Sequence, residues 1–101
     1  MASAFALADK IVSKACRVGI IGLGYVGLPL ARTFSLAGFP VIGFDSDPAK
    51  VALLQEGKSY LRHIDAETLA QMRQAGFDAA ASLQRVRETD AILICVPTPL
   101  T

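Results

Sequence analysis

Three glycines and one aspartate in this sequence have a spacing that suits the binding of a ligand. The stretch GLGYVG directly follows the apolar run VGII and places glycine at positions 22, 24 and 27. Asp45 lies eighteen residues after Gly27, at the end of a second apolar run. Because glycine is costly inside regular structure, this spacing predicts a tight turn from a strand into a helix, which a ligand approaches closely.

Each of these positions has a physical role in binding a dinucleotide. Gly22 permits the tight turn, Gly24 lets the backbone approach a pyrophosphate, and Gly27 lets the helix pack against the sheet. The unpaired N–H groups and the dipole of the helix start attract phosphate. Asp45 would accept hydrogen bonds from the adenosine ribose and repel the extra phosphate of NADP, so the sequence predicts NAD. The alternatives are that the glycines serve only strand-to-helix packing and that Asp45 only caps a turn.

Strand-like and helix-like segments alternate along the chain with short connections. The predicted strands are 17–22, 39–45, 77–82 and 90–97, and the predicted helices are 3–14, 25–37, 48–57, 65–76 and 83–89. Since parallel strands need a crossover, which is helical here, the pattern predicts an α/β, Rossmann-like parallel sheet flanked by helices, with strand order 3-2-1-4. We expect residues 1–16 to be an N-terminal helical lead-in and residues 17–101 to be a partial NAD-binding Rossmann domain, truncated after the fourth strand.

Composition excludes several other classes of protein. The 101 residues, 52% of them hydrophobic, are enough for one buried core, and a formal charge of +1 without charged blocks argues against a nucleic-acid or acidic-membrane partner. Cys16 and Cys95 have neither a disulfide framework nor a metal-ligand spacing, which favours reduced thiols in the cytoplasm and no bound metal. The N-terminal stretch MASAFALADKIVSK lacks the pattern of a signal peptide or anchor.

Three longer motifs carry a family resemblance. In their order and spacing, GLGYVGLPLA, GFDSDPAKVALLQEGKSY and ILICVPTPL resemble the N-terminal NAD-binding domain of the UDP-glucose/GDP-mannose dehydrogenase family, over residues 17–101. GKSYLRHI is most similar to the branch that oxidises UDP-N-acetylhexosamines. The resemblance implies oxidation of the C6 alcohol of a nucleotide sugar, such as a UDP-sugar, to a carboxylate with two NAD, as in polysaccharide biosynthesis. A 3-hydroxyacid or 6-phosphogluconate type dehydrogenase, or a non-enzymatic NAD-binding regulatory module, would share the glycine-rich start.

The resemblance also assigns residues to the cofactor. It places residues 22–27 at the pyrophosphate, Asp45 at the adenosine ribose and Lys50 beside that ribose, although Lys50 is equally consistent with a solvated helix residue. The expected cofactor-binding residues are Gly22, Leu23, Gly24, Tyr25, Val26, Gly27, Asp45, Lys50, Val96, Pro97, Thr98 and Pro99, the last four lining the cleft after the fourth strand. The catalytic cysteine of the family belongs to motifs later in a longer chain. We therefore expect no catalytic residue here, an inactive fragment, and a homo-oligomeric enzyme at full length.

Three further residues invite a functional interpretation. His63 is the only histidine and therefore a candidate general base, but an ordinary loop histidine is expected because the family places no catalysis there. Cys95 is expected in the middle of a buried strand, as a small apolar residue. Pro29, about five residues into the predicted helix, is either a tolerated early kink or sets the angle at which the first turn meets the cofactor.

Overall fold

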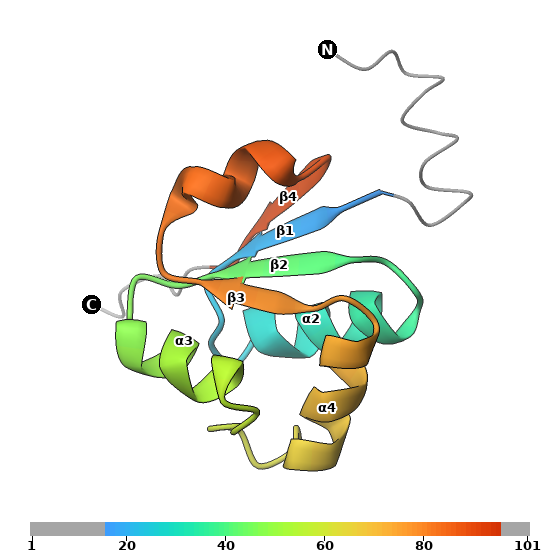
Figure 1. The fold of residues 1–101 in the computed structure, drawn as a ribbon, viewed down its shortest axis with the longest axis vertical. Coiled ribbons are helices and arrows are strands. Elements are labelled where there is room, and N and C mark those ends of the chain that lie inside the picture. The colour runs from blue at the N-terminus through green and yellow to red at the C-terminus, as the bar shows by residue number, and fades with distance from the viewer. Residues whose placement is uncertain (1–15, 96–101) are drawn as a thin grey trace.

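A four-stranded parallel sheet forms the centre of the fold (Figure 1). The structure is a computed structural model and describes residues 16–95. The strands are β1 (Val18–Ile21), β2 (Val41–Phe44), β3 (Asp78–Ala80) and β4 (Ala91–Ile94). Their order is β3-β2-β1-β4, and Val18 pairs with Val41 on one side and with Ala91 on the other. The predicted fold class and strand order are confirmed.

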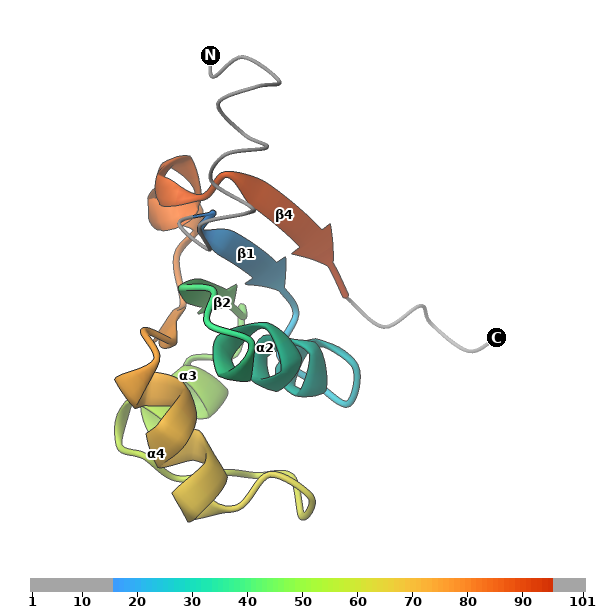
Figure 2. The ribbon, with the colours of Figure 1, turned by 90° about the vertical axis from the view of Figure 1, so that its right-hand side faces the viewer.

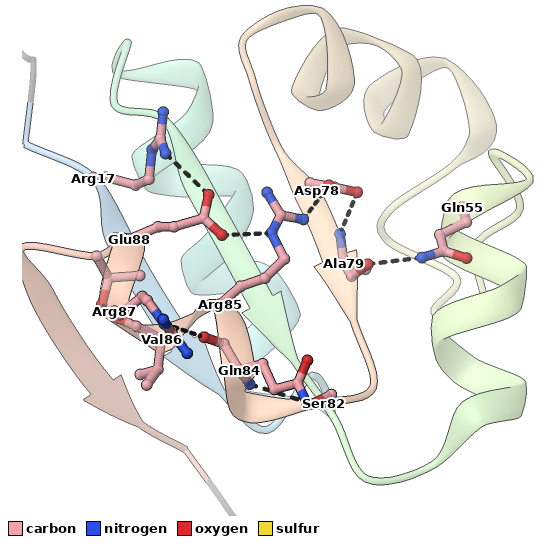
Figure 3. A network of polar contacts seen from close by, with 11 residues as sticks. Arg17, Gln55, Asp78, Ala79, Ser82, Gln84, Arg85, Val86, Arg87 and Glu88 are labelled. Atoms are coloured by element: carbon pink, nitrogen blue, oxygen red, sulfur yellow. Dashed lines mark hydrogen bonds and ion pairs between the residues drawn. The ribbon is translucent and has the colours of Figure 1, made fainter.

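The connections between the strands are helical and cover both faces of the sheet. They are α2 (Gly27–Leu36), α3 (Pro48–Gln55), α4 (Ala66–Gln74) and the 3-10 helix η1 (Leu83–Glu88). Figure 2 shows α2, α3 and α4 grouped together, away from η1. In Figure 3, η1 lies in front of the strands and α2 lies behind them.

Local sequence explains where the helices begin and end. The Asp47 carboxylate accepts the N–H of Ala49 at 2.9 Å, and the intervening Pro48 is the first residue of α3, where its missing N–H costs nothing. The Asp65 carboxylate caps α4 in the same way, through the N–H of Thr68 at 2.8 Å. Asp45–Asp47 thus lies at the point where β2 gives way to α3.

One apolar core fills the space between the sheet and the three α-helices. Its fully buried side chains include Ile20 and Val41 from the sheet and Leu28, Leu54, Leu69 and Met72 from the helices. β4 contrasts with this core, since Ile92 and Ile94 are 46% and 70% exposed. The fourth strand is therefore an exposed edge, as the sequence predicted.

A chain of ion pairs holds η1 across the second face of the sheet (Figure 3). Arg85 contacts Asp78 of β3 at 2.5 Å and Glu88 at 2.9 Å, and Glu88 contacts Arg17 at 3.4 Å. The Arg85 guanidinium holds the pKa of the Glu88 carboxyl below its usual range. Exposed pairs of this kind contribute little to stability because solvent screens them, so they orient η1 more than they stabilise the fold.

Several sequence predictions need correction at the level of single residues. α2 begins at Gly27 rather than Tyr25, so Pro29 is the third helical residue and removes a hydrogen bond only from the first turn. Cys95 follows β4 instead of lying within it, and it is half-buried. The short helix predicted at 83–89 is a 3-10 helix and ends at Glu88. The predicted helix at 3–14 and the predicted site residues 96–99 lie outside the described residues.

Candidate cofactor site

A cleft of about 1140 Å³ opens beyond the carboxyl ends of β1 and β2. Open α/β sheets bind their ligands at this edge. The lining residues are Ile21, Gly22, Gly24, Tyr25, Val26, Phe44, Asp45, Ser46, Asp47, Lys50, Tyr60, Leu61, Ala81, Leu83 and Cys95. Of the predicted site residues that the structure describes, six are in this lining, namely Gly22, Gly24, Tyr25, Val26, Asp45 and Lys50. Leu23 and Gly27 are not among the lining residues.

The glycine loop, residues 22–27, has a different steric demand at each glycine. Gly22 adopts φ 98°, a conformation that favours glycine, and its N–H donates to the carbonyl of Phe44 at 2.7 Å. A Cβ on Gly27 would lie 1.6 Å from the carbonyl oxygen of Gly22, whereas a Cβ on Gly24 would meet nothing within 4 Å. Two glycines therefore shape the turn and its packing, and the middle one leaves open space at the cleft.

The first turn of α2 offers unpaired hydrogen-bond donors. Within residues 16–95, the N–H groups of residues 24–27 donate to no other described residue. The pairing that follows begins with the N–H of Leu28, which donates to the carbonyl of Gly24 at 3.2 Å. Unpaired N–H groups at a helix start, aided by the helix dipole, bind anions. The open space at Gly24 and these donors fit a pyrophosphate group.

The carboxylate of Asp45 joins the glycine loop to the turn before α3. One of its oxygens accepts the N–H of Leu23 and the other accepts the N–H of Asp47, each at 2.9 Å. Asp45 therefore caps the turn before α3. Because an ionised carboxylate offers about four acceptor positions, two of them remain for a ligand hydroxyl.

Tyr60 forms a second link to the glycine loop. Its hydroxyl donates to the carbonyl of Leu23, and the ammonium group of Lys50 lies 5.7 Å from the centre of its ring. Burial, reinforced by the negative charges of Asp45 and Asp47, raises the pKa of Tyr60 to about 12. The phenol therefore remains a proton donor throughout the physiological pH range. Lys50 lies in the wall of the cleft, against this ring.

Sequence analysis did not identify Tyr60 as a site residue. The segment GKSYLRHI has no helical or strand periodicity, and Tyr60 reaches a loop 37 positions earlier in the chain. The one available signal was the tyrosine of GKSY itself, a side chain with both an aromatic surface and a hydroxyl donor just after the end of α3.

The remaining candidates are placed as follows. Cys95 lines the cleft, and its N–H donates to the carbonyl of Ile21 at 2.7 Å. His63 is exposed and outside the cleft lining, and its carbonyl accepts a hydrogen bond from Arg32 at 3.2 Å. Among residues 16–95, no three His, Cys, Asp or Glu side chains could hold a metal ion together. Over the same residues, no helix has the length and apolar character needed to cross a membrane.

Comparison with known proteins gives a consistent result. The NAD binding domain model of the UDP-glucose/GDP-mannose dehydrogenase family matches residues 16–101. The chain is 34% identical to the UDP-N-acetyl-D-mannosamine dehydrogenase of Methanococcus aeolicus over 93 residues, which is 92% of this chain and 20% of that protein. It is 38% identical to the GDP-mannose 6-dehydrogenase of Pseudomonas aeruginosa over 86 residues, which is 82% of this chain and 20% of that protein.

Among solved structures, the fold is similar to that of a UDP-glucose dehydrogenase from Pyrobaculum islandicum. The TM-score is 0.77 at 32% identity, and the match covers 85% of this chain and 21% of that one. The chain thus spans about a fifth of the length of the curated relatives that it matches. The resemblance noted from three motifs is confirmed, and the chain belongs to the UDP-glucose/GDP-mannose dehydrogenase family, whose NAD-binding domain it matches.

Proposed function

We propose that this chain is the NAD-binding part of a nucleotide-sugar 6-dehydrogenase, an enzyme that oxidises the C6 alcohol of a UDP-sugar to a carboxylate. The observation that carries the proposal is the row of unpaired N–H groups at residues 24–27, beside open space at Gly24, at the mouth of a cleft. NAD, when bound, supplies the hydride acceptor for the oxidation. This chain contributes the binding and orientation of that cofactor.

The contacts proposed for NAD follow from the cleft lining. The pyrophosphate lies against the N–H groups of residues 24–27, and the adenosine ribose donates its hydroxyls to the free acceptor positions of Asp45. Lys50 lines the same cleft as this carboxylate. The 2′-phosphate of NADP would meet the negative charges of Asp45 and Asp47, so NAD is the preferred cofactor. Residues 96–99, which follow Cys95 in the sequence, are proposed as further lining.

The wider setting of the chain is also a proposal. Relatives that oxidise UDP-N-acetylated sugars, together with the segment GKSYLRHI, support a UDP-N-acetylhexosamine as the sugar. We propose residues 17–101 as a partial Rossmann domain with residues 1–16 as its lead-in, and a cytoplasmic homo-oligomer as the working enzyme, in polysaccharide biosynthesis. The catalytic groups then belong to the part of the relatives that this chain does not span.

Cofactor titration tests the proposal directly. We expect NAD to bind the chain and NADP to bind at least about tenfold more weakly, because two carboxylates face the added phosphate. Asp45→Asn should reduce this preference, whereas Glu67→Gln, which neutralises an exposed carboxylate on α4, should leave it unchanged. Calorimetry with both nucleotides measures the two affinities. Absence of NAD binding, or equal binding of NADP, would contradict the proposal.

An activity assay tests separately whether this chain binds the cofactor without catalysing the oxidation. The chain of 101 residues should form no NADH from UDP-sugars at any NAD concentration, since no catalytic group is assigned to it. Absorbance at the NADH band measures turnover. Sustained NADH formation by this chain alone would overturn the assignment of catalysis to other parts of the family's longer proteins.

A further inference from the structure

Leu23, inside the glycine loop, is fixed from three directions. Its side chain is fully buried, and its methyl groups occupy the place where Gly43 of β2 has no Cβ; a Cβ there would lie 2.6 Å from the nearest methyl. Its N–H is bound by the Asp45 carboxylate and its carbonyl by the Tyr60 hydroxyl. The residue between the first two glycines of the loop is therefore held by its side chain, its N–H and its carbonyl.

The geometry of the peptide bond extends this restraint to the cofactor donors. The carbonyl of Leu23 and the N–H of Gly24 belong to one planar, trans peptide unit, in which they point in opposite directions. A hydrogen bond that fixes the carbonyl toward Tyr60 therefore fixes the Gly24 N–H in the opposite direction. That N–H is the first of the unpaired donors at residues 24–27.

Tyr60 is itself held in place by its surroundings. Its ring packs against the apolar core and lies beneath the Lys50 ammonium group. The loop that carries Tyr60 follows the end of α3. The hydrogen bond therefore joins the α3 side of the cleft to the glycine loop. A single hydroxyl thus connects elements that are distant in the sequence.

We propose that Tyr60 is a positioning residue for cofactor binding: its hydrogen bond to the Leu23 carbonyl orients the Leu23–Gly24 peptide and so pre-arranges the N–H groups that receive the pyrophosphate. Tyr60 acts through the backbone of the glycine loop and needs no contact with the pyrophosphate itself. This inference rests on the proposed binding of NAD at the same loop. It assigns a role in phosphate recognition to a side chain outside the glycine motif.

The test compares Tyr60→Phe with Thr33→Val in the full chain. The first substitution removes the hydroxyl and keeps the ring, and the second removes a side-chain hydrogen bond to the Pro29 carbonyl on the exposed side of α2. We expect Tyr60→Phe to weaken NAD binding about three- to tenfold, the range for one lost hydrogen bond. Binding of adenosine, which lacks the pyrophosphate, should change less than twofold. Thr33→Val should leave both affinities unchanged.

Each outcome has a defined meaning. A loss of less than threefold for NAD in folded Tyr60→Phe, or an equal loss for adenosine, overturns the positioning role while the proposed function stands. Failure of the unmodified chain to bind NAD overturns the proposed function and this inference with it.

A spectroscopic measurement tests the same hydrogen bond without relying on affinity. In ¹⁵N and ¹³C spectra, Tyr60→Phe should shift the Gly24 amide and Leu23 carbonyl signals more than Thr33→Val does. If Tyr60→Phe does not fold, slow exchange of the Tyr60 hydroxyl proton in the unmodified chain tests the bond. Rapid exchange of that proton with solvent would refute it.

Discussion

Alanine substitution at two glycines of the same loop should separate folding from cofactor binding. At Gly27, a Cβ would lie 1.6 Å from the carbonyl oxygen and 2.7 Å from the carbonyl carbon of Gly22, so the end of β1 and the start of α2 would have to move about 1.8 Å apart to reach ordinary contact at 3.4 Å. At Gly24, a Cβ would meet nothing within 4 Å, and φ is outside the range that favours glycine. One substitution therefore strains the fold and the other occupies the cleft.

The expected magnitudes follow from these distances. Overpacking costs about 1–3 kcal/mol when side chains can yield, and a backbone carbonyl yields less, so Gly27→Ala should destabilise the chain by about 3 kcal/mol or more. For a domain of this size that corresponds to a fall in Tm of roughly 12–24 °C. Gly24→Ala should change the free energy of unfolding by less than about 1 kcal/mol. It should weaken NAD binding by about tenfold or more, since its methyl group takes the space proposed for the pyrophosphate.

Thermal melting and calorimetric titration of the two variants measure these effects, and each variant is the control for the other. The reasoning on packing fails if Gly27→Ala melts within about 3 °C of the unmodified chain. The placement of the pyrophosphate fails if Gly24→Ala is folded and binds NAD with unchanged affinity. A loss of stability in Gly24→Ala as large as that in Gly27→Ala would refute the separation of the two roles.

Two further predictions concern stability. Ser35 is 1% exposed, and its hydroxyl has no hydrogen-bond partner within the described residues. Ser35→Ala should therefore stabilise the chain by about 1 kcal/mol and raise its Tm in a thermal melt. An unchanged or lower Tm would contradict this. The hydrogen bond from the Thr68 N–H lowers the pKa of Asp65 in the folded chain. The ionised carboxylate therefore stabilises the fold at pH values above its unfolded-state pKa. This stabilisation is lost as the pH falls through the lower folded-state pKa. The Tm difference between the unmodified chain and Asp65→Ala should accordingly shrink in melts below about pH 4, and a constant difference would refute the cap.

The strand order and the helix starts could be predicted from the sequence because local rules determine them. Alternation of apolar strands with helical segments specifies parallel pairing, and Asp47 followed by Pro48 combines a favoured N-cap residue with a favoured first helical residue. The ends of elements were less predictable. The sequence placed Cys95 inside a strand, but β4 ends one residue earlier, where the chain begins to line the cleft. Apolar composition continues past that point and gives no sign of the end.

The candidate site was predictable where backbone geometry demands a particular residue type. Gly22 has a positive φ, and Gly27 lies against a backbone carbonyl. Both conditions favour glycine, so both positions can be recognised in the sequence. Tyr60 cannot be recognised in this way, because its partner is the backbone carbonyl of Leu23, a group that every residue type carries. A side chain that acts on the backbone of a distant segment can be identified only when the fold brings the two together.

Asp45 shows why a structural and a functional interpretation of one residue need not compete. Its two hydrogen bonds, from the N–H groups of Leu23 and Asp47, bind the glycine loop to the start of α3. These bonds also fix the orientation of the carboxylate, so the acceptor positions that remain have a defined direction before any ligand arrives. Binding of the proposed ribose then requires no reordering of this side chain, and the associated entropy cost is small. Under the proposed function, the hydrogen bonds that cap the turn are therefore also the ones that orient Asp45 toward the ribose of NAD.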